Sequence, residues 1–105
     1  KTDWDRAQNV RRAEAVALLV ANGGAMPVCP QANSSLFFGQ CTESFWHEGT
    51  MELLYRCDAV VMVPGWEGSK GAKAERSEAA KIGMPVFTMR GGRIPGLRFF
   101  VEMPE

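Results

Sequence analysis

The sequence lacks a net charge, a long apolar run and a signal-peptide pattern. Twelve lysines and arginines balance twelve aspartates and glutamates among its 105 residues, so no overall positive field would attract nucleic acid. The longest apolar run, residues 15–21, is far shorter than the ~20 residues that a membrane span needs. No basic segment followed by apolar and small residues indicates a secretory signal. We therefore expect neither nucleic acid nor a membrane as a partner.

Cysteine and histidine are also scarce. The three cysteines, Cys29, Cys41 and Cys57, form no C-x-x-C pair, and the single histidine, His47, cannot complete a zinc-finger pattern with them. We expect no metal site and no cofactor. Free thiols, buried or half-buried, are typical of a protein in a reducing cytoplasm.

The remaining composition is that of one globular domain, with 46% hydrophobic and 23% charged residues. Apolar spacing predicts three helices: from Asp3 or Asp5 to Gly23, from Thr42 or Ser44 to Tyr55, and over 70–82 behind a Ser69 cap. A break near Gly49 and Thr50 is an option in the second helix. Short apolar runs predict strands at 25–29, 59–63 and 85–89, and the tail 97–103 is a candidate edge strand.

Helices and strands alternate along the chain, which predicts a parallel sheet with helices on both faces. We expect a single α/β domain over residues 1–105, a three-layer sandwich of the flavodoxin or Rossmann type. Such units begin with a strand, whereas this chain opens at a helix. We therefore expect an N-terminally truncated domain with a gap in its sheet, filled by the tail 97–103, by a partner chain or by residues that a structure would not resolve.

The loop after the central strand is the candidate binding site, because ligands bind at the carboxyl ends of strands in open α/β sheets. Ser69 and the first amides of the next helix form an end that is ready to bind an anion. Gly65, Gly68 and Gly71 would let a ligand approach the backbone closely. Glu75 follows within two helical turns. On spacing alone, a capped helix with a solvated glutamate explains these residues as well.

The sequence resembles the nucleoside 2-deoxyribosyltransferase superfamily in three stretches. These are N-V-R-R-A-E at 9–14, C-P-Q-A-N at 29–33 and R-C-D-A-V-V-M-V-P-G-W-E-G-S-K-G-A-K-A-E at 56–75. They are most similar to an uncharacterised branch with a P-G-W-E-x-S-x-G-A-x-x-E motif, and the likeness covers most of residues 4–89. The resemblance implies a site for ribosyl groups and a homodimer in which neighbours complete each other's sites.

The resemblance also implies roles for individual residues. Glu75 falls on the glutamate that attacks the anomeric carbon of the sugar and forms a covalent glycosyl intermediate. Ser69 falls where related deoxynucleotide N-hydrolases hold the 5′-phosphate, and the amides as far as Ala72 would contribute. Trp66 is a candidate for stacking on the base, although packing explains an aromatic beside a glycine turn at least as well.

Two functions stay open on this basis. The first is cleavage of the N-glycosidic bond of a nucleoside or deoxynucleotide, or transfer of its deoxyribosyl group. The second is non-catalytic binding of a nucleotide or nucleotide sugar. Thr50, which stands where characterised members carry aspartate, and the absence of the family's first-strand tyrosine favour the second. Phe37 and Phe38, adjacent apolar residues in a polar loop, predict a homodimer contact.

Other charged residues are weaker candidates. His47 beside Glu48 is more typical of a solvated helix start than of an acid–base pair. Arg11 and Arg12 are candidates for a phosphate contact, but most such arginines are surface residues that serve solubility and ion pairing.

Overall fold

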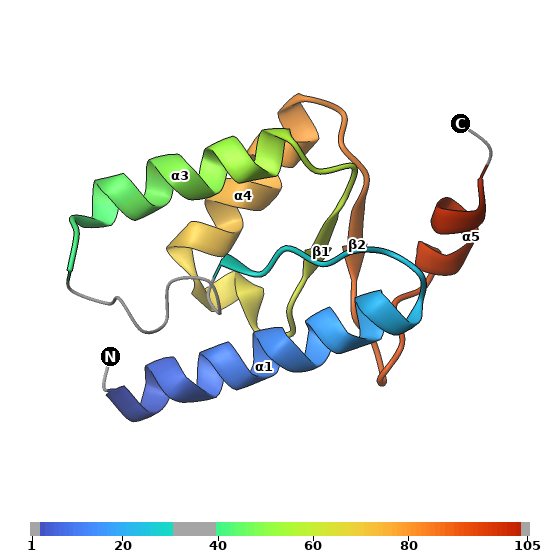
Figure 1. Cartoon of the computed structure of the whole chain (residues 1–105), viewed down its shortest axis with the longest axis horizontal. Coiled ribbons are helices and arrows are strands. Elements are labelled where there is room, and N and C mark those ends of the chain that lie inside the picture. Colours follow the sequence, from blue (N-terminus) through green and yellow to red (C-terminus); the bar gives the residue numbers. More distant parts are fainter. Residues whose placement is uncertain (1–2, 31–39, 104–105) are drawn as a thin grey trace.

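The computed structural model describes residues 3–30 and 40–103. Its elements are α1 (Asp3–Asn22), α3 (Glu43–Tyr55), β1 (Val60–Met62), the 3-10 helix η2 (Trp66–Gly68), α4 (Lys70–Lys81), β2 (Val86–Thr88) and α5 (Leu97–Glu102) (Figure 1). The described residues thus form a mixed α/β structure with a two-stranded sheet, which confirms the predicted class. None of the helices in these two ranges is long and apolar enough to cross a membrane.

The sheet is a parallel pair, and α4 is the crossover helix between its strands. Val61 lies opposite Phe87 in the register. β1 is apolar throughout, a composition typical of a strand that is covered on both faces. Since successive side chains of a strand point to opposite faces, Val61 and Val63 share one face and Met62 lies on the other.

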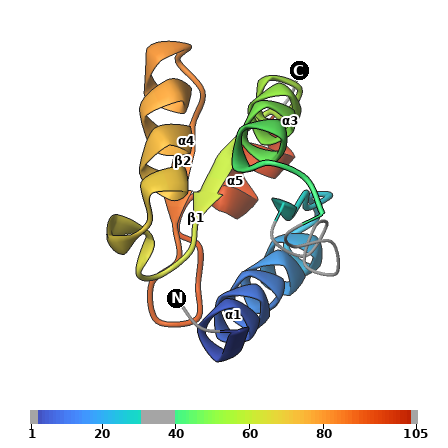
Figure 2. The ribbon, with the colours of Figure 1, turned by 90° about the vertical axis from the view of Figure 1, so that its left-hand side faces the viewer.

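Helices pack on both faces of this pair. On one face, Val16 and Val20 of α1 and Leu97 of α5 form a buried cluster, against which Val61 and Phe87 pack. On the other face, α4 packs against both strands, and its Ala79 is 0% exposed. Figure 2 shows α4 on one side of β1 and α1 with α5 on the other. The small Ala79 side chain lets α4 approach the sheet closely.

The three predicted helices are confirmed. α1 ends in a turn at which Gly24 adopts a φ of +97°. α3 begins after Thr42, whose hydroxyl accepts a hydrogen bond of 3.1 Å from the Phe45 N–H. It continues without a break through Gly49 and Thr50. Because α3 packs along α4, tertiary contact outweighs the weak helix propensity of those two residues.

Two predicted strands are wrong. Residues 25–29 form no strand, and no described residue pairs with them in a sheet. The tail forms helix α5, preceded by Gly96 with a φ of +84°. Within α5, Phe100 packs on Phe87 of β2 with ring centroids 5.5 Å apart. A short apolar run fits a strand and a buried helix equally well, so only the packing partners distinguish the two.

A hollow of about 1100 Å³ lies beside β1 and is lined on one side by residues 25–30. Towards β2, Val60 donates its N–H to Pro85 and Met62 accepts from Met89. Because successive residues of a strand alternate the direction of their peptide groups, the N–H and C=O of Val61 face the opposite edge. No strand of the described residues pairs with this edge, and the residues of β1 line the hollow.

Truncation of Leu97 tests whether the α1–α5 cluster holds the sheet. We expect Leu97→Ala to lower the free energy of unfolding by about 2 to 4 kcal/mol, because it leaves a cavity between α1, α5 and the sheet. Urea unfolding measures the difference. Leu18→Ala on α1 is the matched control, since Leu18 is 63% exposed. Equal effects of the two substitutions would contradict the assignment of the core.

Candidate functional site

A single turn of 3-10 helix joins β1 to α4 and fixes the geometry of the candidate site. Gly65 begins it with a φ of +89°, a conformation that a residue with a Cβ rarely adopts. The Trp66 N–H then donates to the Val63 carbonyl over 3.0 Å, and the Ser69 N–H donates to the Trp66 carbonyl over 2.9 Å. These two bonds hold the connection between strand and helix in one conformation.

Ser69 caps α4, as the sequence predicts. Its hydroxyl accepts a hydrogen bond of 3.2 Å from the Ala72 N–H. The N–H groups of Lys70 and Gly71 precede the first intrahelical acceptors, so the helix supplies no partner for them. No acidic residue lies in the first turn. The start of α4 thus offers backbone donors and the positive end of a helix dipole.

Glu75 lies on the buried side of α4. Its spacing of three and four residues from Ala72 and Ala79 places all three on one stripe of the helix, and Ala79 is fully buried. Burial raises the pKa of Glu75, and the positive charge of His47 on α3 offsets part of that rise. Among the described residues Glu75 makes neither a hydrogen bond nor an ion pair. Its carboxylate is therefore partly desolvated and available to a ligand.

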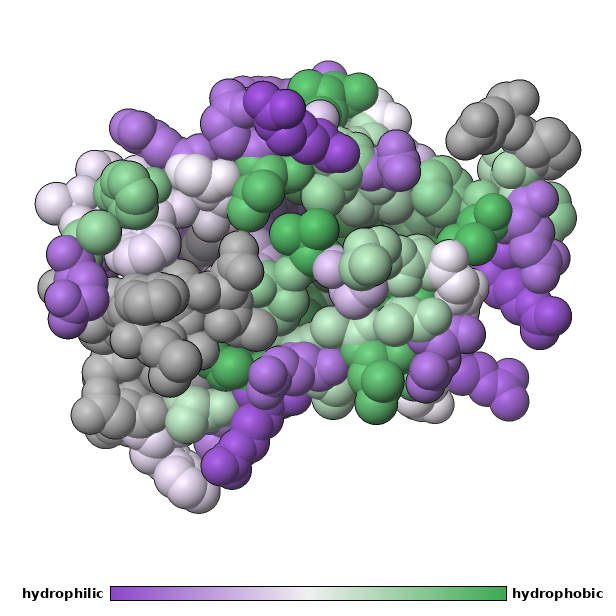
Figure 3. All heavy atoms as spheres, in the orientation of Figure 1, coloured by the Kyte–Doolittle hydropathy of each residue, from purple (hydrophilic) through white to green (hydrophobic). Residues whose placement is uncertain are grey.

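The structure brings most of the predicted site residues to one hollow, the one beside β1. Its wall includes Gly65, Trp66, Gly68, Ser69, Ala72 and Glu75. Gly71 does not contribute to this wall. On the face shown in Figure 3, apolar residues gather across the middle and hydrophilic residues lie around the margin. The predicted site is thus one continuous surface, with Gly71 outside it.

The glycines of the loop differ in whether the backbone conformation requires glycine at their positions. Gly65 is required by its positive φ. Gly68 has no positive φ, and a Cβ built on it would meet no other atom within 4 Å. A Cβ on Gly71 would make only an ordinary contact of 3.9 Å with the Ser69 hydroxyl. Folding of the described chain therefore does not require glycine at position 68, which opens directly onto the hollow.

Sequence reasoning undervalued two charged residues of the site. Arg12 lines the hollow, and its guanidinium approaches the Asn9 side chain at 3.5 Å, whereas Arg11 lies outside the wall. The signal was present, because helical spacing places Arg12 near the face of Asn9 and Val16. His47 acts on Glu75 through its charge, an interaction between two helices that spacing along one of them does not reveal.

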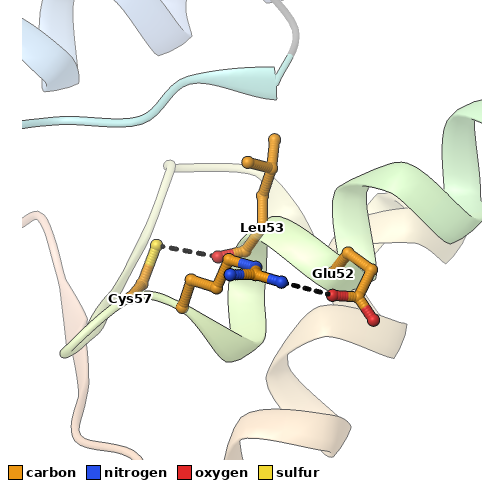
Figure 4. A network of polar contacts seen from close by, with 4 residues as sticks. Glu52, Leu53 and Cys57 are labelled. Atoms are coloured by element: carbon orange, nitrogen blue, oxygen red, sulfur yellow. Dashed lines mark hydrogen bonds and ion pairs between the residues drawn. The ribbon is translucent and has the colours of Figure 1, made fainter.

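The cysteines of the described residues are free thiols. Cys57 donates its S–H to the Leu53 carbonyl over 3.2 Å at the end of α3 (Figure 4), and burial and then Asp58 raise its pKa. Cys41 is exposed, contrary to the expectation of buried or half-buried thiols. Within 3–30 and 40–103, no three histidine, cysteine, aspartate or glutamate side chains gather as a metal site.

The fold and the site define an α/β domain whose helix terminus and acidic side chain share one hollow. The family model of a domain of unknown function, DUF4406, matches residues 7–88, and the chain belongs to this family. The matched region contains every residue of the candidate site named above. Neither the comparison with curated proteins nor the comparison with solved structures found a match.

The Ser69 cap can be tested through stability. We expect Ser69→Ala to lower the free energy of unfolding by about 1 kcal/mol, because the Ala72 N–H loses its acceptor. Thermal or urea unfolding measures the change. Ser77→Ala is the matched control, since Ser77 is an exposed serine inside the same helix, where alanine is the better helix former. A loss in Ser77→Ala as large as that in Ser69→Ala would contradict the capping role.

Proposed function

We propose that the chain cleaves the N-glycosidic bond of a nucleoside or deoxynucleotide, or transfers its deoxyribosyl group, with Glu75 as the nucleophile. The observation that supports this most is the unpartnered carboxylate on the buried stripe of α4. Unpaired acids in such positions are costly for folding and are typical of functional sites. Ser69 and Glu75 line the same hollow, so a ligand in it can contact both residues.

The start of α4 suits the 5′-phosphate of such a ligand. Ser69 lines the hollow, and the positive end of the helix dipole at this residue favours an anion there. Ser69 is uncharged, so its side chain does not repel phosphate. Gly68 leaves room for the ligand beside the backbone. A phosphate at this end would place the sugar of the same nucleotide further along the wall, towards Glu75.

The proposed reaction has two displacements at the anomeric carbon. A carboxylate oxygen of Glu75 forms a bond to this carbon while the carbon–nitrogen bond to the base breaks, and the base leaves with the electron pair and takes up a proton. Water or a second base then attacks the same carbon and releases the Glu75 carboxylate. Partial desolvation favours the first step, because a poorly hydrated carboxylate is a stronger nucleophile.

We extend the proposal to the whole protein. Helices on both faces of a parallel sheet support a three-layer sandwich of the flavodoxin or Rossmann type, within the nucleoside 2-deoxyribosyltransferase-like superfamily. The homodimer stays a prediction, since Phe37 and Phe38 lie outside the described residues. A cytoplasmic location also stays a prediction, supported by free thiols.

A non-catalytic nucleotide-binding module is the second candidate, and Thr50 is the observation that favours it. Thr50 lines the same hollow as Glu75, and its hydroxyl cannot serve as a second carboxylate. A binding module would need the start of α4 and the open space at Gly68, but it would not need an ionised Glu75.

Glu75→Ala separates the two functions. We incubate the wild type with a panel of nucleosides and deoxynucleotides, follow free base by chromatography and measure binding by calorimetry. We expect base release to fall roughly a thousandfold or more in Glu75→Ala, because the covalent route is lost, while nucleotide affinity stays within a few fold. Binding without base release by the wild type would favour the module, and neither binding nor release would overturn both candidates.

The pH dependence of base release tests the state of Glu75. The nucleophile must be ionised, and burial raises the pKa of Glu75, so activity should fall with decreasing pH at a higher pH than for an ordinary glutamate. Since the charge of His47 lowers the pKa of Glu75, His47→Gln should move this acid limb to a still higher pH. A profile of kcat/KM against pH measures both shifts. If His47→Gln leaves the acid limb unchanged, the assignment of this limb to Glu75 is contradicted.

A further inference from the structure

Arg76 lies over the indole ring of Trp66. The guanidinium carbon of Arg76 is 5.2 Å from the ring centroid, within the range of a cation–π interaction. Arg76 is on α4, ten residues beyond Trp66, and η2 packs against α4. Within the part of the chain that the structure describes, Arg76 makes no ion pair. The contact with the Trp66 indole is therefore the interaction that the structure shows for the charged guanidinium of Arg76.

Trp66 contributes to the wall of the hollow at the same time. It is half-buried and lines the hollow together with Ser69 and Glu75. The backbone of Trp66 is fixed on both sides by its hydrogen bonds to Val63 and Ser69. The orientation of the ring, in contrast, depends on side-chain contacts, and the Arg76 guanidinium supplies one of them.

We propose that Arg76 is a positioning residue, which holds the Trp66 indole as a flat wall against which the aromatic base of a ligand stacks. This inference rests on the proposed nucleotide site and adds a selectivity to it. The site prefers ligands with an aromatic base to sugar phosphates that lack one. The cation above the indole restricts its rotation, so that the ring is already oriented when the ligand arrives.

A solvated arginine that touches Trp66 incidentally would leave a different signature. In that case, substitution of Arg76 would change the affinity for every anionic ligand by a similar factor, because only its long-range charge would matter. A positioning role instead changes the affinity for ligands that carry a base and leaves sugar phosphates almost unaffected. Lysine would restore most of the function, since it also places a cation over the ring.

The experiment uses two probes, 2-deoxyribose 5-phosphate and a deoxynucleoside 5′-monophosphate, and measures their binding by calorimetry. We expect Trp66→Leu to weaken nucleotide binding by about tenfold through loss of stacking, and Arg76→Gln to weaken it by a smaller factor that Arg76→Lys restores. The affinity for the sugar phosphate should stay within twofold in all three variants. Lys73→Gln, which removes an exposed cation from the same helix, is the matched control. It should not change the affinity for one probe more than the affinity for the other.

A second readout uses the indole itself. In a Trp4→Phe, Trp46→Phe background, Trp66 is the single tryptophan. We expect its emission to change in Arg76→Gln but not in Lys73→Gln, and to respond to the nucleotide but not to the sugar phosphate. Nucleotide binding that is unaffected by Trp66→Leu or Arg76→Gln would overturn this inference and leave the proposed function standing. Failure of the wild type to bind either probe would overturn the proposed function, and this inference with it.

Discussion

The connection between β1 and α4 is the constraint on which the candidate site depends. A buried parallel strand has to end, reverse direction and restart as a helix that packs on the same sheet. Here the positive φ of Gly65 and two backbone hydrogen bonds around Trp66 make that reversal within one 3-10 turn. Because α4 must then bury Ala79 against the sheet, its rotation about its own axis is set. That rotation turns Glu75 inward.

The candidate site follows from this geometry. A helix that starts beside the end of a strand presents its positive end to the same space as the residues on its buried stripe. Glu75 is on that stripe, and the charge of His47 offsets only part of the cost of its desolvation. α1 closes the other side of the hollow and brings Arg12 to it. The capping serine Ser69, the acid Glu75 and the cation Arg12 thus line one hollow from elements that lie far apart in the sequence.

Local signals predicted α4 and its Ser69 cap correctly. Serine before a helical pattern indicates a cap, and its six-residue spacing places Glu75 within two turns of the helix start, so both could be derived without tertiary information. The conformation of residues 25–29 could not be derived in this way. A strand needs a neighbouring strand as a partner, and a hollow separates this segment from β1. The tail 97–103 was ambiguous because its conformation also depends on a packing partner. In the structure it forms a helix that packs on Phe87.

Contacts between elements were the least predictable part of the site. The interaction of Arg76 with Trp66 crosses a turn, and the effect of His47 on Glu75 crosses from α3 to α4. Neither has a periodic signature, because each depends on how two helices or a helix and a loop pack. Sequence analysis assigned His47 to a solvated helix start, and the structure shows it to be part of the electrostatic environment of Glu75.

The central claim is that the start of α4 and the Glu75 carboxylate face one ligand space. The most direct measurement is the pKa of Glu75 from the NMR signal of its carboxyl carbon, with and without inorganic phosphate. The proposed site predicts a pKa above that of an ordinary glutamate, and a further rise when phosphate binds near residues 69–72, because a second negative charge then opposes ionisation. An ordinary pKa that phosphate leaves unchanged would contradict the claim.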